Sequence, residues 1–544
     1  MKWIKDRKKF LESIKDDSLD ILSNNDQGQD PKLQDNLEKL DKVETSNPVV
    51  VRFGPSPTGM LHIGGIRTAL YNYLFAKKHG GKFILRIEDT DQKRFVPAAE
   101  EYIKKALEWV GIVPDEDPWK GGPNGPYRQS ERDYTKHTKT LLDSGHAYYA
   151  FDTEEEMAVH KQKDPHFTYN SKTREGLRNS LTLSKEEVEK LLADNTPYVI
   201  RFKVPANINV SFDDIIRGNV AINSNQIDDK ILIKSSGMVS YHMANVCDDH
   251  DMGVTHVLRG EEWVNSTPFH CLLYEAFGWN KPQFAHLPAI LRPDGRGKLS
   301  KRDGLKYGIP VFPFGGEGVD DKGQTVRYKG FQDEGFDPDV VINFLLLLGW
   351  APSDGKEIYS MAEMISDFSL DRVHKAGARF DVDKAKWFNS QYLQTRSDDE
   401  LLKSIDQGNI YQYSPDKLSM IVDLCKKRSS LKTEMQIVAN IFFKPVILQD
   451  TDIQSLSSEY KQVFISFLDK VDNIEWEADK IKQLIHDICV ELKVKMGKVM
   501  PSLRLAITGG VPGPDLMTTM FILGKEESID RIKSSLVEKS NESD

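Results

Sequence analysis

The sequence predicts an α/β fold followed by an all-α module, and three observations lead to this class. Over residues 49–87 a β-branched strand, a glycine-bearing loop, a helical repeat of apolar residues and a second apolar strand follow one another. Strand, helix and strand in this order make a βαβ unit of a parallel sheet, and ligands bind at the carboxyl ends of such strands. From about residue 395 onward strand patterns fade and amphipathic helices dominate.

The elements of the βαβ unit can be placed on the sequence. The first strand covers residues 49–53, and Ile66, Leu70, Tyr73 and Leu74 then recur at helical spacing until two glycines stop them. The second strand begins at Phe83. The loop after each strand is therefore a candidate for ligand binding.

Further elements follow in chain order. A helical stretch is expected to start at GPYRQSERDY, residues 125–134. Short strands mixed with charged helices over residues 150–235 indicate an insertion, after which buried strands return near residues 255–258. The glycine-rich segment 313–324 is expected to be a surface loop before a helical hairpin that ends in LLLLGWAP, residues 345–352.

Composition excludes several classes of protein. The chain has 544 residues, 39% of them hydrophobic, which indicates several globular domains at roughly 100–200 residues each. No apolar run approaches the roughly 20 residues that span a bilayer. The four scattered cysteines form no CxxC pair, which argues against a disulfide framework or a zinc site and fits a reducing cytoplasm. A net charge of -10 leaves a local basic surface possible.

Residues 1–47 are a polar N-terminal extension that mixes lysines with many acidic residues. A secretory signal has an apolar centre and a transit peptide avoids acids, so neither is indicated. An amphipathic stretch over residues 3–22 would suit docking on a partner, but a solvated arm is the simpler interpretation.

The loop after the first strand lacks the GxxxxGK[ST] and GxGxxG fingerprints but carries Thr58, His62, Gly64 and Gly65 where the helix opens. Free backbone N–H groups and the helix dipole favour an anion there, and the glycines let a phosphate come close. His62 would donate to phosphate oxygens, as a neutral or a charged group, while charge grows there during a displacement. For this motif alone, a helix-capping histidine in a tight turn is the simpler interpretation.

A second motif, GKLSKRDG at residues 297–304, is a basic loop able to close over a polyphosphate with two lysines and a serine hydroxyl. Taken singly, such a loop is usually a solvated one. Paired with the histidine-glycine turn, it resembles the HIGH and KMSKS signatures of class I aminoacyl-tRNA synthetases. The pair is far more specific than either half.

Longer motifs narrow this resemblance to glutamyl-tRNA synthetases of the bacterial type. They are RFGPSPTGMLHIGGIRTALYNYLFAKKHGGKFILRIEDTD, GPYRQSERDY, YHMANVCDDHDMGVTHVLRGEEW and SLRLAITGG. The resemblance runs from about Val49 to the C-terminus. It implies a Rossmann-type catalytic domain with an inserted acceptor-binding domain, followed by an all-α anticodon-binding module.

The domain boundaries that the resemblance implies fall in chain order. The first half of the catalytic domain is expected at 48–128, the inserted tRNA acceptor-binding domain at 129–238 and the second catalytic half at 239–295. The KMSKS-like loop with a helical domain that contacts the tRNA stem is expected at 296–390, and the helical anticodon-binding domain at 391–544.

The activity that the resemblance implies is ATP-dependent ligation of L-glutamate to the 3' end of tRNA(Glu). The α-carboxylate of glutamate attacks the α-phosphate of ATP to give glutamyl-adenylate and diphosphate, and the terminal ribose then takes the acyl group and releases AMP. Both steps need positioning and charge stabilisation. The implied cofactors and partners are ATP with Mg2+, glutamate and tRNA(Glu), with no membrane, in a cytoplasmic monomer.

Matched to the family motifs, one set of residues would hold ATP and its transition-state charge. These are Thr58, His62, Gly64, Glu262, Trp263, Lys298, Ser300 and Lys301. Within this set, His62 and Lys301 are the predicted catalytic residues.

A glutamate site needs two cations for the carboxylates and one anion for the ammonium group. Arg52 and Arg259, each at the end of a strand, suit a carboxylate, and Glu88 at the end of the second strand suits the ammonium. The side-chain carboxylate is assigned to Arg52. The alternative for each arginine is a surface or interdomain ion pair; for Arg52, which lies inside an apolar strand, it is discounted, because an unpaired buried guanidinium is costly. By resemblance the pocket is completed by Ser56, Tyr241 and Asn245.

The sequence also departs from the family pattern. Many relatives bind zinc through cysteines of the inserted domain, but residues 148–152 contain none, so no structural zinc or other metal site is expected. The first signature ends in glycine, which leaves phosphate assistance to His62 alone. The second has Arg302 where many synthetases have serine, and residues 313–324 look like an insertion without an assigned role.

Anticodon reading is assigned to the helical C-terminal third, since single-stranded loops are recognised by stacking and base-edge hydrogen bonds. Arg428 matches a position where an arginine reads the last anticodon base in discriminating relatives. A helix-surface charge beside Lys426 and Lys427 is an equally good interpretation.

Four other kinds of protein share parts of this pattern. Glutaminyl-tRNA synthetases have β-barrel anticodon domains, and a shortened relative that glutamylates a modified base has no anticodon module; the helical C-terminal third argues against both. Nucleotidyltransferases that make CDP- or ADP-linked metabolites are usually much shorter, and a noncatalytic tRNA-binding paralogue would not keep His62, Lys301 and Arg52. Whether tRNA(Gln) is also glutamylated stays open.

Overall fold

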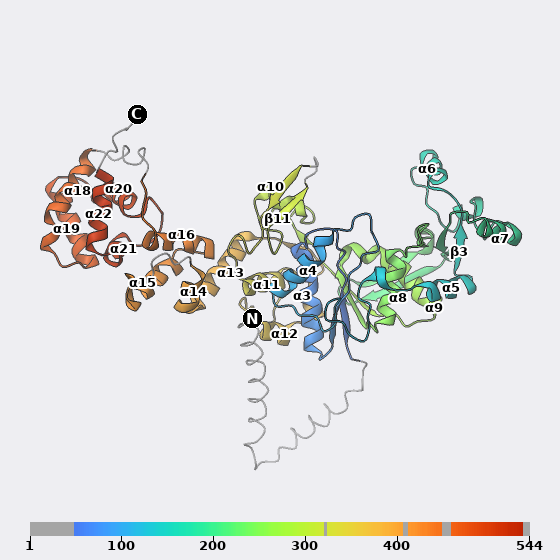
Figure 1. Ribbon diagram of the computed structural model, residues 1–544. Helices are drawn as coiled ribbons and strands as arrows, with labels where there is room; N and C mark the ends of the chain where they lie inside the picture. Colours follow the sequence, from blue (N-terminus) through green and yellow to red (C-terminus); the bar gives the residue numbers. More distant parts are fainter. Residues whose placement is uncertain (1–47, 320–323, 406–411, 449–457, 537–544) are drawn as a thin grey trace, which may run out of the picture. The chain divides into compact units, whose positions relative to one another are not determined.

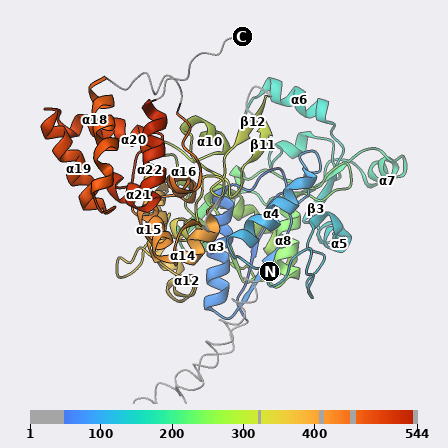
Figure 2. The same ribbon diagram turned by 60° about the vertical axis from the view of Figure 1, so that its left-hand side comes forward.

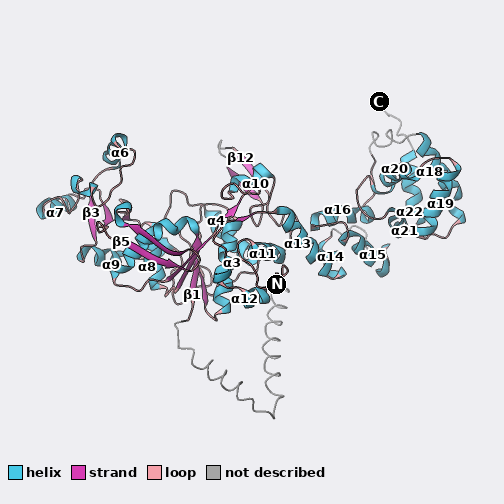
Figure 3. Ribbon diagram, turned by 180° about the vertical axis from the view of Figure 1, so that it is seen from behind, coloured by secondary structure: helices cyan, strands magenta, loops and turns pink. Residues whose placement is uncertain are grey.

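The computed structural model describes residues 48–319, 324–405, 412–448 and 458–536 (Figure 1). The polar extension over residues 1–47, with its predicted amphipathic stretch, lies outside these ranges. The last described strand ends at Arg379, and the described secondary structure after it consists of helices alone (Figure 3). The predicted α/β fold with a helical C-terminal part is confirmed.

The predicted βαβ unit forms the start of the described chain. Strands β1 (Val50–Phe53) and β2 (Lys82–Leu85) pair in parallel and are joined by helix α3 (Ile63–Lys78). The strands are rich in β-branched and aromatic residues, which pack well on a pleated surface. Gly80 adopts a left-handed φ of 60° and lets the chain leave the helix, as the paired glycines predict.

A second group of strands continues the sheet. Strands β8 (His256–Gly260) and β9 (Gln283–Leu287) pair in parallel, and β9 also pairs with β5 (Asn209–Asp214), which carries β6 (Gly218–Asn223) at the edge. The Thr255 N–H donates to the Val50 carbonyl at 2.9 Å, so β8 begins beside β1. The parallel strands β1, β2, β8 and β9 therefore end at one edge of the molecule, where the functional loops begin.

Helices flank these strands and connect them. Helix α8 (Tyr241–Asp251) precedes β8 and α9 (Thr267–Phe277) follows it. The other short elements of this part are α4 (Pro97–Trp109), β10 (Ile290–Leu291), α10 (Lys301–Tyr307), α12 (Met361–Asp367) and β13 (Ala378–Arg379).

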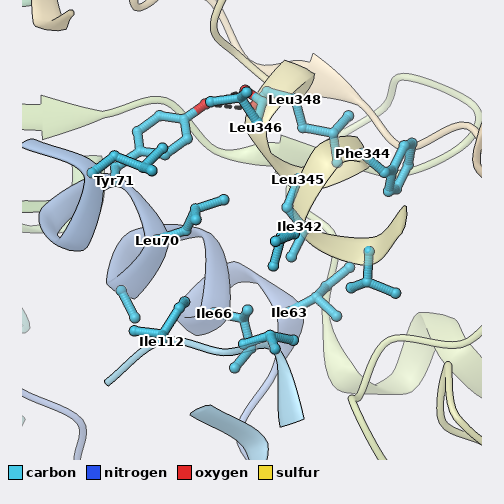
Figure 4. Packing of buried hydrophobic residues seen from close by; sticks show 14 of the residues in the cluster. Ile63, Ile66, Leu70, Tyr71, Ile112, Ile342, Phe344, Leu345, Leu346 and Leu348 are labelled. Carbon is cyan, nitrogen blue, oxygen red and sulfur yellow. Dashed lines mark hydrogen bonds between the residues drawn. The ribbon is translucent and has the colours of Figure 1, made fainter. Parts of the chain in front are cut away.

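Helix α3 is held by a buried apolar contact with α11 (Pro338–Leu347), shown in Figure 4. The contact is made by Ile63, Ile66, Leu70, Ile342 and Leu345. Burying an aliphatic side chain of this size contributes about 1.5–3 kcal/mol. In addition, the Tyr71 hydroxyl donates to the Leu346 carbonyl at 2.8 Å and Arg67 donates to the Leu348 carbonyl at 2.7 Å. The helix that follows the first signature is thus fixed to a helix that follows the second.

The segment predicted to be inserted contains short strands and charged helices, as expected. Its antiparallel sheet has the order β3-β4-β7, and its helices α6 and α7 each begin with a capping box. The bounds are α5 (Thr135–Asp143), β3 (Ala147–Ala150), α6 (Glu154–Lys163), α7 (Lys185–Ala193), β4 (Val199–Phe202) and β7 (Ile231–Ile233). However, β5 and β6 from the same segment join the sheet of β8 and β9.

A polar cluster lies beside the cysteine-free stretch of residues 148–152. The Tyr148 hydroxyl donates to the buried Asp229 carboxylate at 2.6 Å, and Arg174 pairs with the same carboxylate at 3.0 Å. Among the described residues, no group of three or more His, Cys, Asp or Glu side chains is arranged to hold a metal ion. The described helices also include none with the length and apolar character that a bilayer crossing requires.

The motif GPYRQSERDY does not start a helix, contrary to the prediction. Residues Gln129–Glu131 form a short 3-10 turn, and α5 begins only at Thr135. The reason is that the motif makes contacts outside itself. Gln129 donates to Asp248 at 2.8 Å and the Ser130 N–H donates to Asp89 at 2.8 Å, which holds the chain in a non-helical path.

The glycine-rich segment forms a β-hairpin, so the prediction of a surface loop is wrong. Strand β11 (Gly316–Val319) pairs antiparallel with β12 (Thr325–Tyr328). The glycines permit close packing: a Cβ on Gly316 would lie 2.8 Å from the Met60 sulfur, and one on Gly318 would lie 2.7 Å from the Tyr328 ring. The predicted helical hairpin is also wrong, because the single helix α11 ends at LLLLGWAP.

The C-terminal part is entirely helical in its described residues and has its own apolar core. Helices α18 to α22 pack together in both Figure 1 and Figure 2. The bounds are α13 (Val382–Thr395), α14 (Asp398–Ser404), α15 (Pro415–Lys426), α16 (Lys432–Phe443), α18 (Ser458–Lys470), α19 (Ala478–Glu491), α20 (Met496–Thr508), α21 (Leu516–Leu523) and α22 (Lys525–Leu536).

Candidate active site

A cavity of about 570 Å3 lies where the parallel strands end. Most of the residues predicted to bind ATP or glutamate line it. They are Arg52, Ser56, His62, Gly64, Glu88, Tyr241, Arg259, Glu262, Trp263, Lys298, Ser300 and Lys301. The structure thus brings the two signature segments, more than two hundred residues apart in the sequence, to one cavity.

Two predicted residues do not line the cavity. The Asn245 amide donates to Glu88 Oε1 at 3.2 Å, so it holds the Glu88 carboxylate from a neighbouring position on α8. The Thr58 backbone N–H donates to the Ser56 carbonyl at 2.9 Å and shapes the turn before His62.

His62 is the N-cap of α3 and faces the cavity at the same time. Its Nδ1 accepts the Gly64 N–H at 3.1 Å, so in the neutral ring the proton is on Nε2. Nε2 is buried and has no hydrogen-bond partner among the described residues. The two interpretations of the motif are therefore compatible: one ring nitrogen caps the helix and the other is a free donor at the cavity wall.

The charge state of His62 follows from its surroundings. Burial lowers its pKa to about 3, and the nearby Lys301 and Lys298 add to this effect. The ring is therefore neutral near pH 7. A neutral imidazole still carries an Nε2–H group, so of the two charge states that the sequence left open for His62 the lowered pKa favours the neutral one.

We expect acid to destabilise the protein through His62. Its pKa lies near 3 in the folded chain and near 6.5 in an unfolded one, so only the unfolded chain takes up this proton as the pH falls between these values. The free energy of unfolding should therefore fall with decreasing pH in this window. The measurement is the midpoint of thermal unfolding from pH 7 to pH 4 for the wild-type protein and for His62→Asn. The variant should show the shallower decline; parallel curves would contradict the lowered pKa.

The second signature places two lysines differently. Lys298 forms an ion pair with Glu262 at 3.0 Å, in which both side chains are about half exposed. Lys301 has no ion-pair partner among the described residues, and burial lowers its pKa. A Cβ on Gly59 would lie 3.5 Å from the Lys301 amine, so this lysine reaches across to the first signature loop.

Ser300 sets the geometry of this second loop. It is the N-cap of α10, and both its N–H, at 2.8 Å, and its hydroxyl, at 2.6 Å, donate to the Asp303 carboxylate. The capping contact fixes the point at which Lys301 enters the helix.

The side of the cavity predicted for glutamate rests on a buried network of charges. Arg52 Nε donates to Asp249 at 2.9 Å, and Arg86 donates to Asp249 at 2.7 Å and to Glu88 at 2.9 Å. Burial alone would raise the pKa of Asp249, but the two arginines outweigh it and hold the value below the usual range. Arg52 thus forms a buried ion pair, neither the surface pair nor the interdomain pair that was the alternative for it, and it lines the cavity as well.

Arg259 differs from Arg52 in its partners. It is buried, and its guanidinium contacts His286, His270 and Thr267, all of them neutral acceptors. No carboxylate of the described chain lies within ion-pairing distance of it. Burial lowers its pKa. Unlike the charge of Arg52, the positive charge of Arg259 is therefore not balanced by a neighbouring carboxylate among the described residues.

Aromatic rings form one wall of the cavity. The rings of Tyr241 and Trp263 stack with centroids 4.3 Å apart. At the other end the Phe312 ring meets the His62 ring edge-on at 6.1 Å, and the Ile63 N–H donates to the Val311 carbonyl at 3.1 Å. The segment before the hairpin therefore supports the first turn of α3.

Sequence reasoning missed Arg86, Asp249 and Arg67. Arg86 lies two residues before Glu88 at the end of the second strand, the same kind of position that singled out Arg52. Asp249 is one of two consecutive buried acids on a helix whose other buried residues, apart from Asn245, are apolar. A buried charge within an apolar run is the signal that would have indicated both residues.

Arg428 lies far along the chain, just after α15, and its side chain is exposed. Of the three basic residues in this run, Lys426 pairs with Asp398 and Lys427 pairs with Asp423. Arg428 has no ion-pair partner in the described residues. Its assignment to the anticodon stays a prediction.

The chain matches two family models. One, described as the catalytic domain of class I tRNA synthetases (E and Q), matches residues 48–309 and 321–387, and the other, an anticodon-binding domain, matches residues 383–536. A glutamate–tRNA ligase of Cytophaga hutchinsonii is 45% identical over 515 residues, which are 91% of this chain and 98% of the relative. One of Flavobacterium johnsoniae is 46% identical over 502 residues, 90% of this chain and 99% of the relative.

Solved structures give the same result. The crystal structure of a glutamate tRNA ligase from Elizabethkingia meningosepticum, in complex with its amino acid, is 48% identical with a TM-score of 0.80 and covers 90% of this chain and 99% of that one. The glutamate-tRNA synthetase of Elizabethkingia anophelis is 47% identical with a TM-score of 0.78, over 90% of this chain and 100% of that one.

Proposed function

The chain belongs to the glutamate–tRNA ligases, which are class I tRNA synthetases, and from this premise we propose that it joins L-glutamate to the 3' end of tRNA(Glu) at the expense of ATP. The observation that carries the proposal is one cavity that residues of both signature segments line together with the guanidinium groups of Arg52 and Arg259. The bacterial-type resemblance, the class I catalytic domain and the helical anticodon-binding domain all agree with it.

In the first step the α-carboxylate of glutamate attacks the α-phosphate of ATP, and diphosphate leaves. His62 Nε2–H and the Lys301 amine are the donors that we assign to the charge growing on the phosphate oxygens. The buried neutral ring supports this role, because its Nε2–H group loses little solvation when it meets an anion, and Lys301 supports it because its amine reaches the first signature loop and has no ion-pair partner among the described residues. Mg2+ enters with ATP as part of the substrate.

The remaining ATP contacts are assigned to the groups that surround these two donors. Gly64, at the start of α3, lets a phosphate group approach the N-terminus of the helix. Lys298 exchanges its exposed ion pair with Glu262 for a phosphate group, and Trp263 supplies an aromatic face. Thr58 shapes the turn, and Ser300 positions the second loop.

Glutamate is assigned to the other side of the cavity. Arg52 and Arg259 bind its carboxylates, and Glu88 accepts its ammonium group. The two guanidinium groups differ in charge balance, since Arg52 is already paired with Asp249 while Arg259 is not. The side-chain carboxylate of glutamate keeps its charge throughout the reaction. The difference in charge balance supports assigning this carboxylate to Arg259, rather than to Arg52 as the sequence suggested. Ser56, Tyr241 and Asn245 complete the pocket, Asn245 by holding Glu88.

In the second step the terminal ribose hydroxyl of the tRNA attacks the activated carbonyl, and AMP leaves. We assign the acceptor end to residues 129–238, the stem to residues 296–390 and the anticodon to residues 391–544, where Arg428 is exposed and unpaired in the described chain. The proposal includes action as a monomer in the cytoplasm, without zinc.

Charging of purified tRNA with labelled glutamate tests this function. Attachment of glutamate to tRNA(Glu), and exchange of diphosphate into ATP that needs both glutamate and tRNA, are the expected results. Exchange driven by glutamine, or by CTP without tRNA, would contradict the proposal. Charging of tRNA(Gln) in the same assay would identify a non-discriminating enzyme.

A further inference from the structure

The guanidinium of Arg259 contacts two histidines and a threonine, and an aspartate and a third histidine contact those two rings in turn. Arg259 Nε donates to His286 Nε2 at 3.1 Å, Nη2 donates to the Thr267 hydroxyl at 2.8 Å, and both Nη atoms lie 3.3 Å from His270 Nδ1. All these acceptors are buried. Because an arginine has only donors, the network holds it only if each facing ring nitrogen carries a lone pair instead of a proton.

Asp214 decides this for His286. His286 Nδ1 lies 2.6 Å from Asp214 Oδ2, and both groups are fully buried. The carboxylate accepts only, so the ring proton is on Nδ1 and the lone pair on Nε2 faces Arg259. The backbone N–H groups of Ile216, at 3.0 Å, and Arg217, at 2.8 Å, donate to Asp214 Oδ1 and fix the carboxylate in turn.

His270 is fixed by the same logic from the other side. Its Nδ1 accepts from Arg259, so its proton is on Nε2, which lies 3.0 Å from His242 Nδ1. Burial, together with the charge of Arg259, keeps the pKa of His270 well below its ordinary value. The chain of contacts therefore contains one anion, at Asp214, and it is separated from the guanidinium by a neutral ring.

From this arrangement we propose that Asp214, His286 and His270 are positioning residues for substrate selection: they orient Arg259 through neutral acceptors and so reserve its positive charge for a substrate carboxylate. The proposal rests on the proposed function, in which that substrate is glutamate. A carboxylate in direct contact would orient Arg259 equally well but would compete with the substrate. A neutral amino acid such as glutamine offers no charge to match and leaves the buried guanidinium without an anion.

The register of the sheet explains how the network forms. Arg259 on β8 and His286 on β9 are directly paired residues of parallel strands, and Asp214 ends β5 on the other side of β9. Three adjacent strands thus place the arginine, the ring and the carboxylate in a row. Strands β5 and β6 come from the segment predicted to be inserted, so part of that segment serves the amino-acid site.

The test is Asp214→Asn. With the amide oxygen kept on the N–H groups of Ile216 and Arg217, the NH2 group takes the place of Oδ2, which accepts both the His286 N–H, at 3.1 Å, and the ring proton on Nδ1. The His286 ring must then accept at Nδ1 and carry its proton on Nε2. The Nε2–H group and the Arg259 Nε–H group, both donors, then face each other. We expect the KM for glutamate to rise by roughly 10- to 100-fold, the value of one or two charge-assisted hydrogen bonds, with kcat and the KM for ATP nearly unchanged.

Two further variants separate positioning from stability. His286→Gln places an amide oxygen where Nε2 accepts, and should keep the KM for glutamate within a few fold of the wild type. His286→Leu removes the acceptor and should match Asp214→Asn. His256→Gln is the matched control, because His256 is on the same strand as Arg259 but contacts Thr255 and Phe75 at the far end.

A direct readout does not depend on activity. Nitrogen chemical shifts of 15N-labelled histidine in the whole protein, with the His286 signal identified by its loss in His286→Gln, report which ring nitrogen carries the proton. The proton should move from Nδ1 to Nε2 in Asp214→Asn. An unchanged KM for glutamate despite this move would overturn the proposal, as would equal losses with Gln and Leu that follow thermal stability alone. A wild-type enzyme inactive with glutamate would instead overturn the proposed function.

Discussion

Replacing His62 with asparagine should lower kcat for glutamylation by about 10²- to 10³-fold, the loss typical of one preorganised donor at a developing charge. The asparagine oxygen can occupy the position of Nδ1 and keep the cap on the Gly64 N–H, but nothing replaces the Nε2–H group. Thermal stability near pH 7 should therefore be preserved. The measurements are steady-state charging of tRNA(Glu) and thermal unfolding of the same preparations.

His62→Gln is the complementary variant, because its side-chain amide can reach the position of Nε2 while the cap is lost. We expect a smaller loss of kcat and a loss of stability of about 1 kcal/mol, the usual value of an N-cap. The opposite ranking, with asparagine active and glutamine inactive, would leave His62 with a capping role alone.

Replacing Arg259 with glutamine should lower kcat/KM for glutamate by about 10²- to 10⁴-fold, since losing one partner of a buried charge pair costs about 2–5 kcal/mol or more. Stability of the ligand-free protein should stay the same or rise, because the guanidinium is buried without an anion among the described residues. Glutamate should raise the thermal midpoint of the wild type but not that of the variant.

Arg86→Gln is the contrasting change at a neighbouring guanidinium. Arg86 is paired with Asp249 and Glu88, so its loss leaves buried carboxylates without their partner and should cost about 3–5 kcal/mol of stability. A large loss of stability in Arg259→Gln, or none in Arg86→Gln, would contradict the assignment of Arg259 to substrate binding and of Arg86 to the stability of the fold.

Much of the fold was predictable because its signals are local. The βαβ unit follows from strand composition, helical spacing and the paired glycines, and these depend on neighbours in the sequence. The hairpin was not predictable in the same way. Its glycines suggest a loop, and their actual role, close packing on Met60 and Tyr328, depends on residues far away along the chain or across the hairpin.

The candidate site shows the same division. Residues of the two signatures could be named because their order is distinctive, and the cavity brings them together. The role of each charge could not be read from order alone. Whether Arg52 is neutralised depends on Asp249, nearly two hundred residues away, and the state of Arg259 depends on an aspartate at the end of β5.

The hydrogen bonds between α3 and the end of α11 have a consequence for how the enzyme works as a unit. The last carbonyl groups of a helix normally turn to water, but here those of Leu346 and Leu348 are taken by Tyr71 and Arg67. Shifting α11 would break these bonds within a packed interior or drag α3 along, and α3 carries His62 at its tip. A displacement of α11 is therefore expected to shift His62 as well, because the two helices are joined by hydrogen bonds and by apolar packing.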